Sequence, residues 1–379
     1  MKDKIPYLIT MLAAILLIFI GHLFAIQNIF VLDDLAHEVI VAKVERITER
    51  ERPFDDFVEF GNFGEFAHAQ SYHINFEARA TRGIRKGDII LASQSFTGFL
   101  PGSIQEIKEG DTVLLINTNI GWFFNGFLRT NKLLFFGLLF IICVIIFGGK
   151  KGFNTIISLS LTIAAVFMVF IPSILSGKNI YIMALLVCLY TTIMTLSIVI
   201  GFNKKALAAA MGCLSGIVIA GILTIIYDKI LLLTGMIDEH SRHLANLPID
   251  TPINLKAIIF AGIIIGAMGA IMDVAMSISS ALWEIKEKAG RINFETMFRS
   301  GITIGRDIFG TMSNTLVLAY IGTSLSLVLL LSVYSNSLLD LFNMEMIVVE
   351  VLKTLAGCFG ILCTMPLTAF FCSVIYLRD

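Results

Sequence analysis

The sequence predicts a membrane protein of mainly α class: an eight-span polytopic helical bundle with a small extracytoplasmic β-barrel-like domain after the first span. Two observations predict this fold class. Of the 379 residues, 56% are hydrophobic and only 15% are charged, a balance outside the usual range of soluble domains. The apolar residues form eight runs long enough to cross a bilayer, and one polar stretch with alternating β-branched residues separates the first run from the others.

The first run, residues 5–26, predicts a transmembrane anchor within residues 1–28. Lys2 and Lys4 precede the run, and at about 1.5 Å per residue its helix would cross a hydrocarbon core of about 30 Å. A cleaved signal peptide is the alternative. The anchor is favoured because the run exceeds the usual apolar region of about 7–15 residues and no A-x-A cleavage site follows it.

Residues 29–131 predict a compact extracytoplasmic β-domain. Runs rich in β-branched residues occur at 37–47, 71–80, 87–95 and 111–119, and their alternation favours strands over helices. KGDII and EGDTVLL each place a Gly-Asp turn before an apolar strand, which is common in small closed barrels. The stretch 51–70 is interpreted as a loop.

Residues 132–379 predict a seven-span membrane domain. Its apolar runs are 132–148, 153–174, 180–201, 206–227, 256–283, 303–332 and 346–376. With the N-terminus inside, the clustered basic residues fall on the cytoplasmic side, as the positive-inside rule requires. They are Lys150, Lys151, Lys204, Lys205, Lys286, Lys288, Arg291, Arg299 and Arg378. Both termini are therefore predicted to be cytoplasmic, and the β-domain outside.

A polar stripe follows one face of the run 256–283 if that run is helical. Three- and four-residue steps connect its members, which are Gly262, Gly266, Gly269, Asp273, Ser277, Ser280 and Glu284. Small residues permit close approach of another helix. A carboxylate that faced lipid inside the hydrocarbon core would cost on the order of 2–3 kcal/mol. Asp273 should therefore face protein, water or an ion. A structural hydrogen bond to a neighbouring helix is the alternative to a functional role.

The next run carries a second stripe, formed by Asp307, Thr311 and Asn314. Because consecutive spans are antiparallel, counting from their shared cytoplasmic end puts Asn314 at a depth similar to that of Asp273. The predicted transport pathway or intramembrane polar cluster contains Asp273, Ser277, Ser280, Asp307, Thr311 and Asn314. Their polar groups suit a proton, a hard cation or a file of water. For Asp307, an acid–base pair with Arg306 that anchors the helix at the inner interface is favoured over a functional role.

Helix packing is predicted to depend on small residues and one proline. They are Gly262, Gly266, Gly269, Gly310, Gly357 and Pro366. Pro366 frees the carbonyl of residue 362 and should kink the last span, with Thr364 and Thr368 as compensating partners. A kinked packing helix is favoured over a gating hinge.

Motifs of common catalytic sites do not occur in the sequence. GGKKGFNT at 148–155 fails the phosphate-loop pattern, and neither H-E-x-x-H nor G-x-S-x-G is present. We therefore predict no enzymatic activity, no cofactor and no metal site. The segment DEHSRH at 238–243 is only a weak metal candidate, because two histidines three residues apart more often belong to a solvated loop.

Three segments in series resemble the YibE/F family of bacterial multi-pass membrane proteins. They are GAMGAIMDVAMSISSALWEI (266–285), GRDIFGTMSNTLVLAYIG (305–322) and LKTLAGCFGILCTMPLTAFF (352–371). The resemblance covers the chain from about residue 132, and the anchor and β-domain are similar to the longer YibE-type members. It implies a location in the bacterial plasma membrane and no established activity. The family's motif residues correspond to Gly269, Asp273, Ser277, Ser280, Gly305, Arg306, Asp307, Gly310, Thr311, Asn314, Thr315, Gly357, Pro366 and Thr368.

The leading functional hypothesis is a permease or channel-like transporter of a small solute or ion through the polar face between the sixth and seventh spans. The alternative is a non-transporting membrane scaffold or sensor whose β-domain binds an envelope partner, with stripes that only hold helices together. The expected partners are the lipid bilayer, a small solute or ion, and an envelope protein at the β-domain, but no nucleic acid. The oligomeric state stays open.

Overall fold

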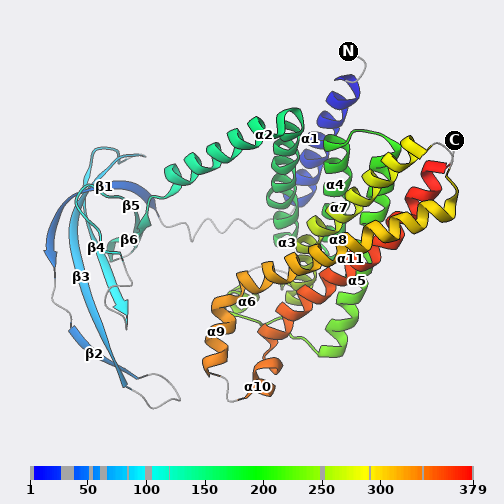
Figure 1. The fold of residues 1–379 in the computed structure, drawn as a ribbon. Coiled ribbons are helices and arrows are strands. Elements are labelled where there is room, and N and C mark those ends of the chain that lie inside the picture. Colours follow the sequence, from blue (N-terminus) through cyan, green and yellow to red (C-terminus); the bar gives the residue numbers. More distant parts are fainter. Residues whose placement is uncertain are drawn as a thin grey trace. The chain divides into compact units, whose positions relative to one another are not determined.

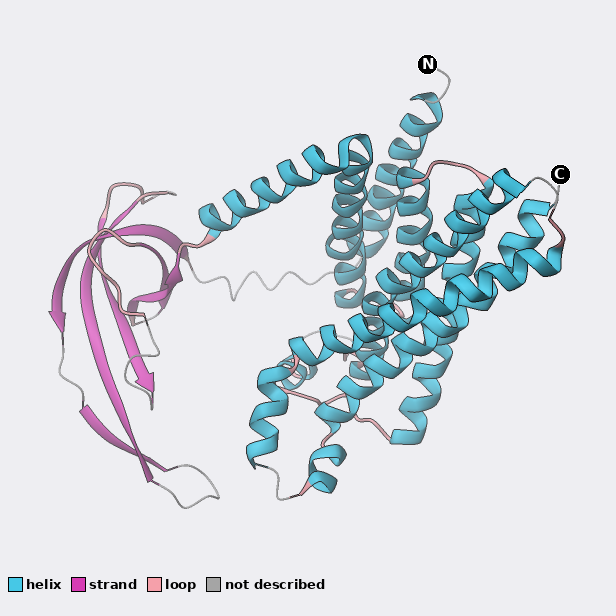
Figure 2. Cartoon of the chain, in the orientation of Figure 1, coloured by secondary structure: helices cyan, strands magenta, loops and turns pink. Residues whose placement is uncertain are grey.

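The computed structural model forms two units, and each is described by itself. Tertiary contacts assign Met1–Phe30 and Val144–Asp379 to one unit and Val31–Cys143 to the other. The residues that the structure describes are 4–26, 38–50, 54–59, 66–82, 85–98, 105–118, 120–247, 252–289, 292–334 and 337–377. Figure 1 labels the helices and strands, and Figure 2 distinguishes them by colour. All the strands of the described residues lie between α1 and α2 in the sequence.

The β unit contains a closed five-stranded barrel. Its strands are β1 (Val39–Arg50), β2 (Phe54–Glu59), β3 (Phe66–Ala80), β4 (Ile89–Gly98), β5 (Thr112–Thr118) and β6 (Gly121–Phe127). The order β1-β5-β6-β4-β3 closes through pairing of β1 with β3, and β2 extends the sheet beyond β3. Neighbouring strands are antiparallel except β4 and β6. A Greek-key barrel whose third and fifth strands alone are parallel has the topology of the OB-fold.

Alternation of apolar and polar residues builds the barrel core. Inward-facing strand side chains such as Phe76 and Leu115 are fully buried, and Ile107 from the connection between β4 and β5 is buried with them. Gln94 is also buried, and its amide oxygen accepts a hydrogen bond from the Ile107 backbone N–H at 3.1 Å, so this polar group is satisfied. On the outer surface, Arg79 donates to Glu45 at 2.5 Å across the β1–β3 pair. This hydrogen bond lowers the pKa of the Glu45 carboxyl.

All four predicted strands occur in the structure, and two further strands were missed. The stretch 51–70, which the sequence predicts to be a loop, contains β2 and the first residues of β3, so that prediction is wrong for residues 54–59 and 66–70. β6, with the sequence GWFFNGF, is partly exposed along most of its length, and its sequence lacks the alternation that identifies a half-buried strand. Pairing with β4 and β5, rather than local pattern, holds β6 in place.

The other unit is helical, and its elements follow one another through short connections. They are α1 (Lys4–Ile26), α2 (Thr130–Ala165), whose first residues belong to the β unit, η3 (Val166–Phe170), α3 (Ile171–Leu175), α4 (Ile180–Val199), α5 (Lys204–Leu231), α6 (Glu239–Ala245), α7 (Leu255–Ala289), α8 (Phe294–Thr323), α9 (Leu325–Tyr334), α10 (Leu338–Asn343) and α11 (Glu345–Leu377). Six stretches of the described chain are long and apolar enough to cross a membrane. They are Ile9–Ile26, Thr130–Leu175, Ile180–Val199, Lys204–Leu231, Leu255–Ala289 and Glu345–Leu377. These stretches support a multi-pass membrane protein.

The six stretches differ from the eight predicted spans for two reasons. The predicted spans 132–148 and 153–174 lie within one stretch, where α2 is interrupted at Gly149 with φ 54° and ψ −132°, a conformation that favours glycine. The predicted span 303–332 is divided between α8 and α9 at Ser324. α8 is not among the six, because Arg306, Asp307 and Asn314 lower its hydropathy.

α1 is a packed member of the helical unit. Tyr7 donates to the Asn154 side chain of α2 at 3.0 Å, and Tyr190 of α4 donates to the Ala14 carbonyl at 3.2 Å. Ser176, which follows α3, donates to the Ala25 carbonyl. The sequence predicts a simple anchor, but these contacts along the whole helix connect α1 to three neighbouring segments.

α11 forms the centre of the helical unit, because it contacts α5, α7 and α8 (Figure 1). Its contact with α5 depends on two glycines. A Cβ at Gly216 would overlap the Thr364 hydroxyl oxygen, and a Cβ at Gly212 would overlap the Thr368 hydroxyl oxygen. The missing side chains allow the α5 backbone to lie directly against α11, as small residues do at close helix contacts.

Glycines of α8 and α11 permit two further close contacts. A Cβ at Gly301 of α8 would lie 2.6 Å from the Ala369 Cβ, and a Cβ at Gly357 of α11 would lie 2.7 Å from Leu316 Cδ2. Both distances are shorter than van der Waals contact. Because α8 packs closely on α11, the orientation of α8 is fixed, and with it the position of its exposed side.

Candidate functional site

The predicted stripe of α7 lies on the side of the helix that faces away from the core. Gly262, Gly266, Gly269, Asp273 and Glu284 are exposed, and Ser277 and Ser280 are half-buried. The opposite side of α7 is fully buried and apolar, with Ile263, Ile264, Ile271, Ile278 and Leu282. α7 is therefore amphipathic, with its apolar side in the core of the helical unit. Its polar side forms part of the outer surface, which is apolar over most of the bundle.

The predicted stripe of α8 is exposed in the same way. Arg306, Asp307, Gly310, Thr311 and Asn314 are all exposed. Thr311 donates to the Ile308 carbonyl of its own helix at 2.9 Å, which leaves its hydroxyl lone pairs free to accept. We call Asp273, Ser277, Ser280, Arg306, Asp307, Thr311 and Asn314 the α7–α8 polar face.

Two contacts fix the level of the stripes along their antiparallel helices. A Cβ at Gly266 of α7 would lie 2.9 Å from the Tyr320 hydroxyl oxygen of α8, and a Cβ at Gly305 of α8 would lie 3.2 Å from Ile278 Cδ1 of α7. Asp273 lies between these contacts on α7, so interpolation places it level with residues 311–314 of α8. The structure thus brings the two stripes to one level, but no hydrogen bond between described side chains joins them.

The charges of the α7–α8 polar face have no compensating partner in the described part of the chain. The side chains of Asp273, Arg306 and Asp307 form no ion pair and no hydrogen bond with another described residue. Arg306 and Asp307 are neighbours in sequence but do not pair, so the acid–base pair favoured by the sequence does not form here. Polar groups that leave their hydrogen-bonding capacity unused are available to water, an ion or another protein surface.

The residues predicted to shape packing divide into two groups. Gly357 and Gly266 approach α8 closely, as described above, whereas a Cβ at Gly262, Gly269 or Gly310 would meet no described atom within 4 Å. Pro366 lies inside α11, which continues beyond it. The neighbouring threonines do not bond the carbonyl that Pro366 frees: Thr364 donates to the Gly360 carbonyl, and the buried Thr368 hydroxyl has no described partner.

Gly212 and Gly216 of α5 are packing residues that the sequence analysis missed. Their spacing, G-x-x-x-G in an apolar run, is a recognised signal for close helix contact. The run 206–227 carries no charged residue, so this spacing is its only sequence signal. Since α5 contacts both α7 and α11, these glycines help to support the buried side of α7 behind the polar face.

A buried hydrogen-bonding cluster ties α7 to α11 and α5 near the end of α7. The Ser279 hydroxyl donates to the Lys205 carbonyl at 2.8 Å and lies 2.6 Å from the Tyr376 hydroxyl, which in turn donates to the Ser279 carbonyl at 3.0 Å. Lys286 donates to the Tyr376 carbonyl. Ser279 and Tyr376 are fully buried, so this cluster is well shielded from solvent.

Tyr376→Phe is expected to lower the free energy of unfolding by about 1–3 kcal/mol, because it removes the donor to the Ser279 carbonyl while the site stays buried. Thermal unfolding of the purified protein in detergent measures the loss. Tyr227→Phe is the matched control, since the Tyr227 hydroxyl has no hydrogen bond to a described residue. Equal unfolding temperatures for the two variants would contradict the assigned role.

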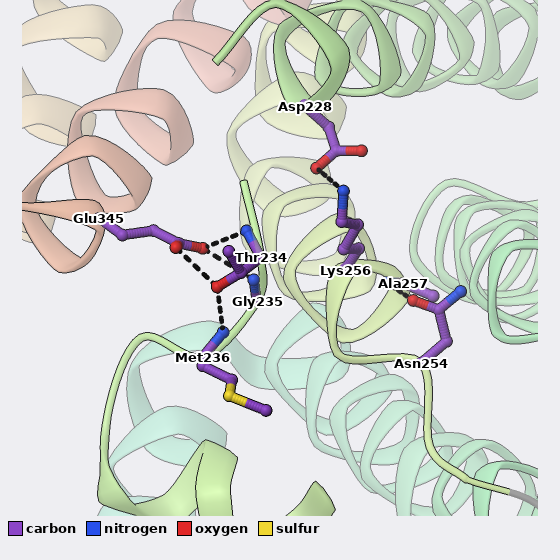
Figure 3. Close-up of polar contacts among 8 residues, drawn as sticks. All are labelled: Asp228, Thr234, Gly235, Met236, Asn254, Lys256, Ala257 and Glu345. Carbon is purple, nitrogen blue, oxygen red and sulfur yellow. Dashed lines mark hydrogen bonds and ion pairs between the residues drawn. The ribbon is translucent and has the colours of Figure 1, made fainter. Parts of the chain in front are cut away.

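A second polar cluster joins the loop after α5 to the start of α11, as Figure 3 shows. The Glu345 carboxylate accepts hydrogen bonds from the Thr234 N–H, the Thr234 hydroxyl and the Gly235 N–H, each at 2.7 Å. Met236 N–H donates to the Thr234 hydroxyl oxygen at 3.2 Å. Gly235 has φ 90°, a conformation that favours glycine. One carboxylate therefore holds three donors of a tight turn.

Beside this turn, a small cavity opens between α4, α5, α7 and α11. Its volume is about 220 Å³, and Tyr181, Asp228, Lys256, Phe260 and Leu352 are among its lining residues. Asp228 and Lys256 form an ion pair at 3.7 Å (Figure 3). Both side chains are partly exposed, so the pair contributes little to stability.

The weak metal candidate at 238–243 forms a short helix, α6. The Asp238 carboxylate caps this helix and accepts from the Ser241 N–H at 2.7 Å and the Ser241 hydroxyl at 2.6 Å. The hydroxyl hydrogen bond lowers the pKa of Asp238. His243 and Glu239 lie 3.8 Å apart on the exposed side. Among the described residues, no group of three or more His, Cys, Asp or Glu side chains could hold a metal ion.

Comparison with known proteins identifies one family. The model of the YibE/F-like protein family matches residues 136–378, which include α7, α8, α11 and the whole α7–α8 polar face. Comparisons with curated proteins and with solved structures give no match. The match covers more than half of the chain and confirms the resemblance that the three sequence segments indicate. The chain belongs to the YibE/F-like protein family.

Proposed function

We propose that this protein is a permease or channel-like transporter of a small solute or ion in the bacterial plasma membrane, and that the α7–α8 polar face lines its pathway. The observation that carries the proposal is the exposed position of three charged side chains, Asp273, Arg306 and Asp307, without partners among the described residues. In a bilayer each such charge near the centre would cost about 2.5–3.5 kcal/mol if it faced lipid. Water or a passing ion removes that cost.

The topology that accompanies this proposal has eight spans and places both termini in the cytoplasm. α2 then crosses twice, before and after Gly149, and α8 with α9 forms the seventh crossing. The polarity of α8, which separates it from the six apolar stretches, is what a pathway-lining helix requires. The β-domain would lie outside and is available for an envelope protein. Transport needs no catalytic group, so we propose no enzymatic activity.

Flux in proteoliposomes tests the proposal. Proton flux is followed with an enclosed pH-sensitive dye, and potassium and sodium flux are followed in parallel. Asp273→Asn should slow the flux seen with the wild-type protein at least about tenfold, which equals about 1.4 kcal/mol in barrier height. Asp340→Asn on α10 is the matched control and should transport normally. Equal flux through the Asp273→Asn variant would remove Asp273 from the pathway.

The rival interpretation, a membrane scaffold or sensor, predicts a different result. If the α7–α8 polar face only docks another protein, Ser277→Cys and Thr311→Cys in a chain without native cysteines should resist a water-soluble thiol reagent when the partner is present. A pathway open to water requires that both react. Deletion of residues 30–130 would abolish a sensor's response without preventing insertion of the helices.

A further inference from the structure

We infer that the α7–α8 polar face is closed by the same face of a second copy of this chain, so that two copies supply the two walls of one pathway. The inference rests on the proposed function for what passes between the walls. The contact between the copies has independent support from charge and from shape.

Charge favours a second copy because the face is complementary to itself. It carries one cation, Arg306, and two anions, Asp273 and Asp307, and none of the three is paired within the described chain. A two-fold axis along the membrane normal brings identical surfaces together in an isologous contact. Arg306 of the partner subunit can then neutralise a carboxylate of the first copy, and the reverse pair forms by symmetry.

Shape favours the same arrangement, because α7 has open space where another helix would approach. Gly262 and Gly269 are exposed, and a Cβ at either position would meet no described atom within 4 Å. Small residues at a helix surface allow a second helix backbone to come close. Gly266 lies against Tyr320 of α8, so the open positions are Gly262 and Gly269. The contact between the copies can form at these two glycines, while Asp273 and Ser277 stay apart and polar.

The apolar run 132–148 of the same chain is a poorer occupant. After Lys132 it contains no charged side chain, so it could not neutralise Asp273, Arg306 and Asp307. A lipid-facing arrangement has the same defect. A surface with both signs of charge can pair with Arg306 and with one of the two carboxylates, and this chain's own face has that property. The second carboxylate of each copy then stays unpaired and faces the pathway.

Cysteine cross-linking in native membranes tests the contact before detergent can dissociate it. In the full chain with its six cysteines replaced, Gly269→Cys should give a disulfide-linked dimer on mild oxidation. Ile222→Cys, at a site of α5 that is 52% exposed, should give none at equal expression. Equal cross-linking at the two sites would indicate random collision and overturn the inference, as would no cross-linking at Gly269.

A bulky substitution separates loss of contact from loss of folding. Gly269→Leu enters space that is open within the chain, so thermal unfolding of the monomer should be unchanged. Copurification of two differently tagged copies should fall at least about tenfold, which equals about 1.4 kcal/mol of association free energy. Ile222→Phe is the control and should leave copurification intact. Unchanged copurification of the Gly269→Leu variant would overturn the inference.

The two proposals fail in different ways. If Gly269→Cys cross-links specifically but Asp273→Asn leaves every measured flux unchanged, the pathway is wrong and the contact between copies stands. If the wild-type protein transports as a monomer in the same vesicles, the second copy is not needed and the inference about closure is wrong.

Discussion

Gly216→Ala is expected to lower the free energy of unfolding by about 1–3 kcal/mol, the usual cost of overpacking a well-packed interior. The added methyl group would overlap the Thr364 hydroxyl oxygen and lie 3.0 Å from the Gly360 carbonyl oxygen. Thr364 cannot rotate away without breaking its own hydrogen bond to that carbonyl, which is 2.7 Å long. The loss should appear as a lower unfolding temperature in detergent and a lower yield of folded protein.

A double-mutant cycle identifies the cause of that loss. Thr364→Ala removes the oxygen that the new methyl group would meet, so Gly216→Ala should cost less in the Thr364→Ala background than in the wild type. Gly137→Ala, where the added Cβ meets nothing within 4 Å, should not destabilise and should gain from the higher helix propensity of alanine. Strict additivity of Gly216→Ala and Thr364→Ala would show that the two side chains do not meet.

Glu345→Gln is expected to cost about 1.5–3 kcal/mol, the usual contribution of a hydrogen bond to a charged group. The carboxylate accepts from three donors of residues 234 and 235, but a glutamine has one carbonyl oxygen and presents an NH₂ group to the remaining donor. Hydrogen exchange at the Thr234 and Gly235 amides should accelerate, and thermal unfolding should occur at a lower temperature.

Glu295→Gln is the matched control for the Glu345 variant. Glu295 also lies in the first turn of a helix, but it is exposed and pairs with Arg299 of the same helix at 2.6 Å. Its replacement should change stability by no more than about 1 kcal/mol. Unaltered exchange at Thr234 and Gly235 in the Glu345→Gln variant would mean that other contacts hold the turn.

The sequence indicates the α7–α8 polar face well because its signal is local. Three- and four-residue steps around Asp273 and Asp307 define sides of helices without any knowledge of neighbours. Counting residues from the shared cytoplasmic end of the two antiparallel spans predicts that the two stripes lie at a common depth. The structure places Asp273 level with residues 311–314 of α8. Which neighbour each side meets is a tertiary property, so the sequence could not show that Gly262, Gly269 and Gly310 are open within the chain. The roles of these residues in a pathway stay predictions.

Other features could be identified only from the three-dimensional structure. β6 pairs with β5, which directly precedes it, and with β4, which is more distant in the chain. The parallel pairing with β4 that reveals the OB topology has no local signal. Hydropathy alone gave two separate spans on either side of Gly149 and a single span over 303–332. The structure also has two helical segments that meet at the non-helical Gly149, whereas it divides the predicted span 303–332 at Ser324. Family membership was recognisable because the three motif segments are contiguous stretches, and the family match confirms it.

The central position of α11 has a consequence for biosynthesis. Ribosomes make this helix after α5, α7 and α8, yet all three pack against it. Until α11 leaves the translocation machinery, Gly212 and Gly216 of α5 and Gly301 of α8 lack the α11 residues against which they pack. Before residue 345 is made, only the contacts among the earlier helices, such as those of α7 with α5 and α8, can form. The helical unit is therefore expected to complete its packing only after its last helix has been inserted.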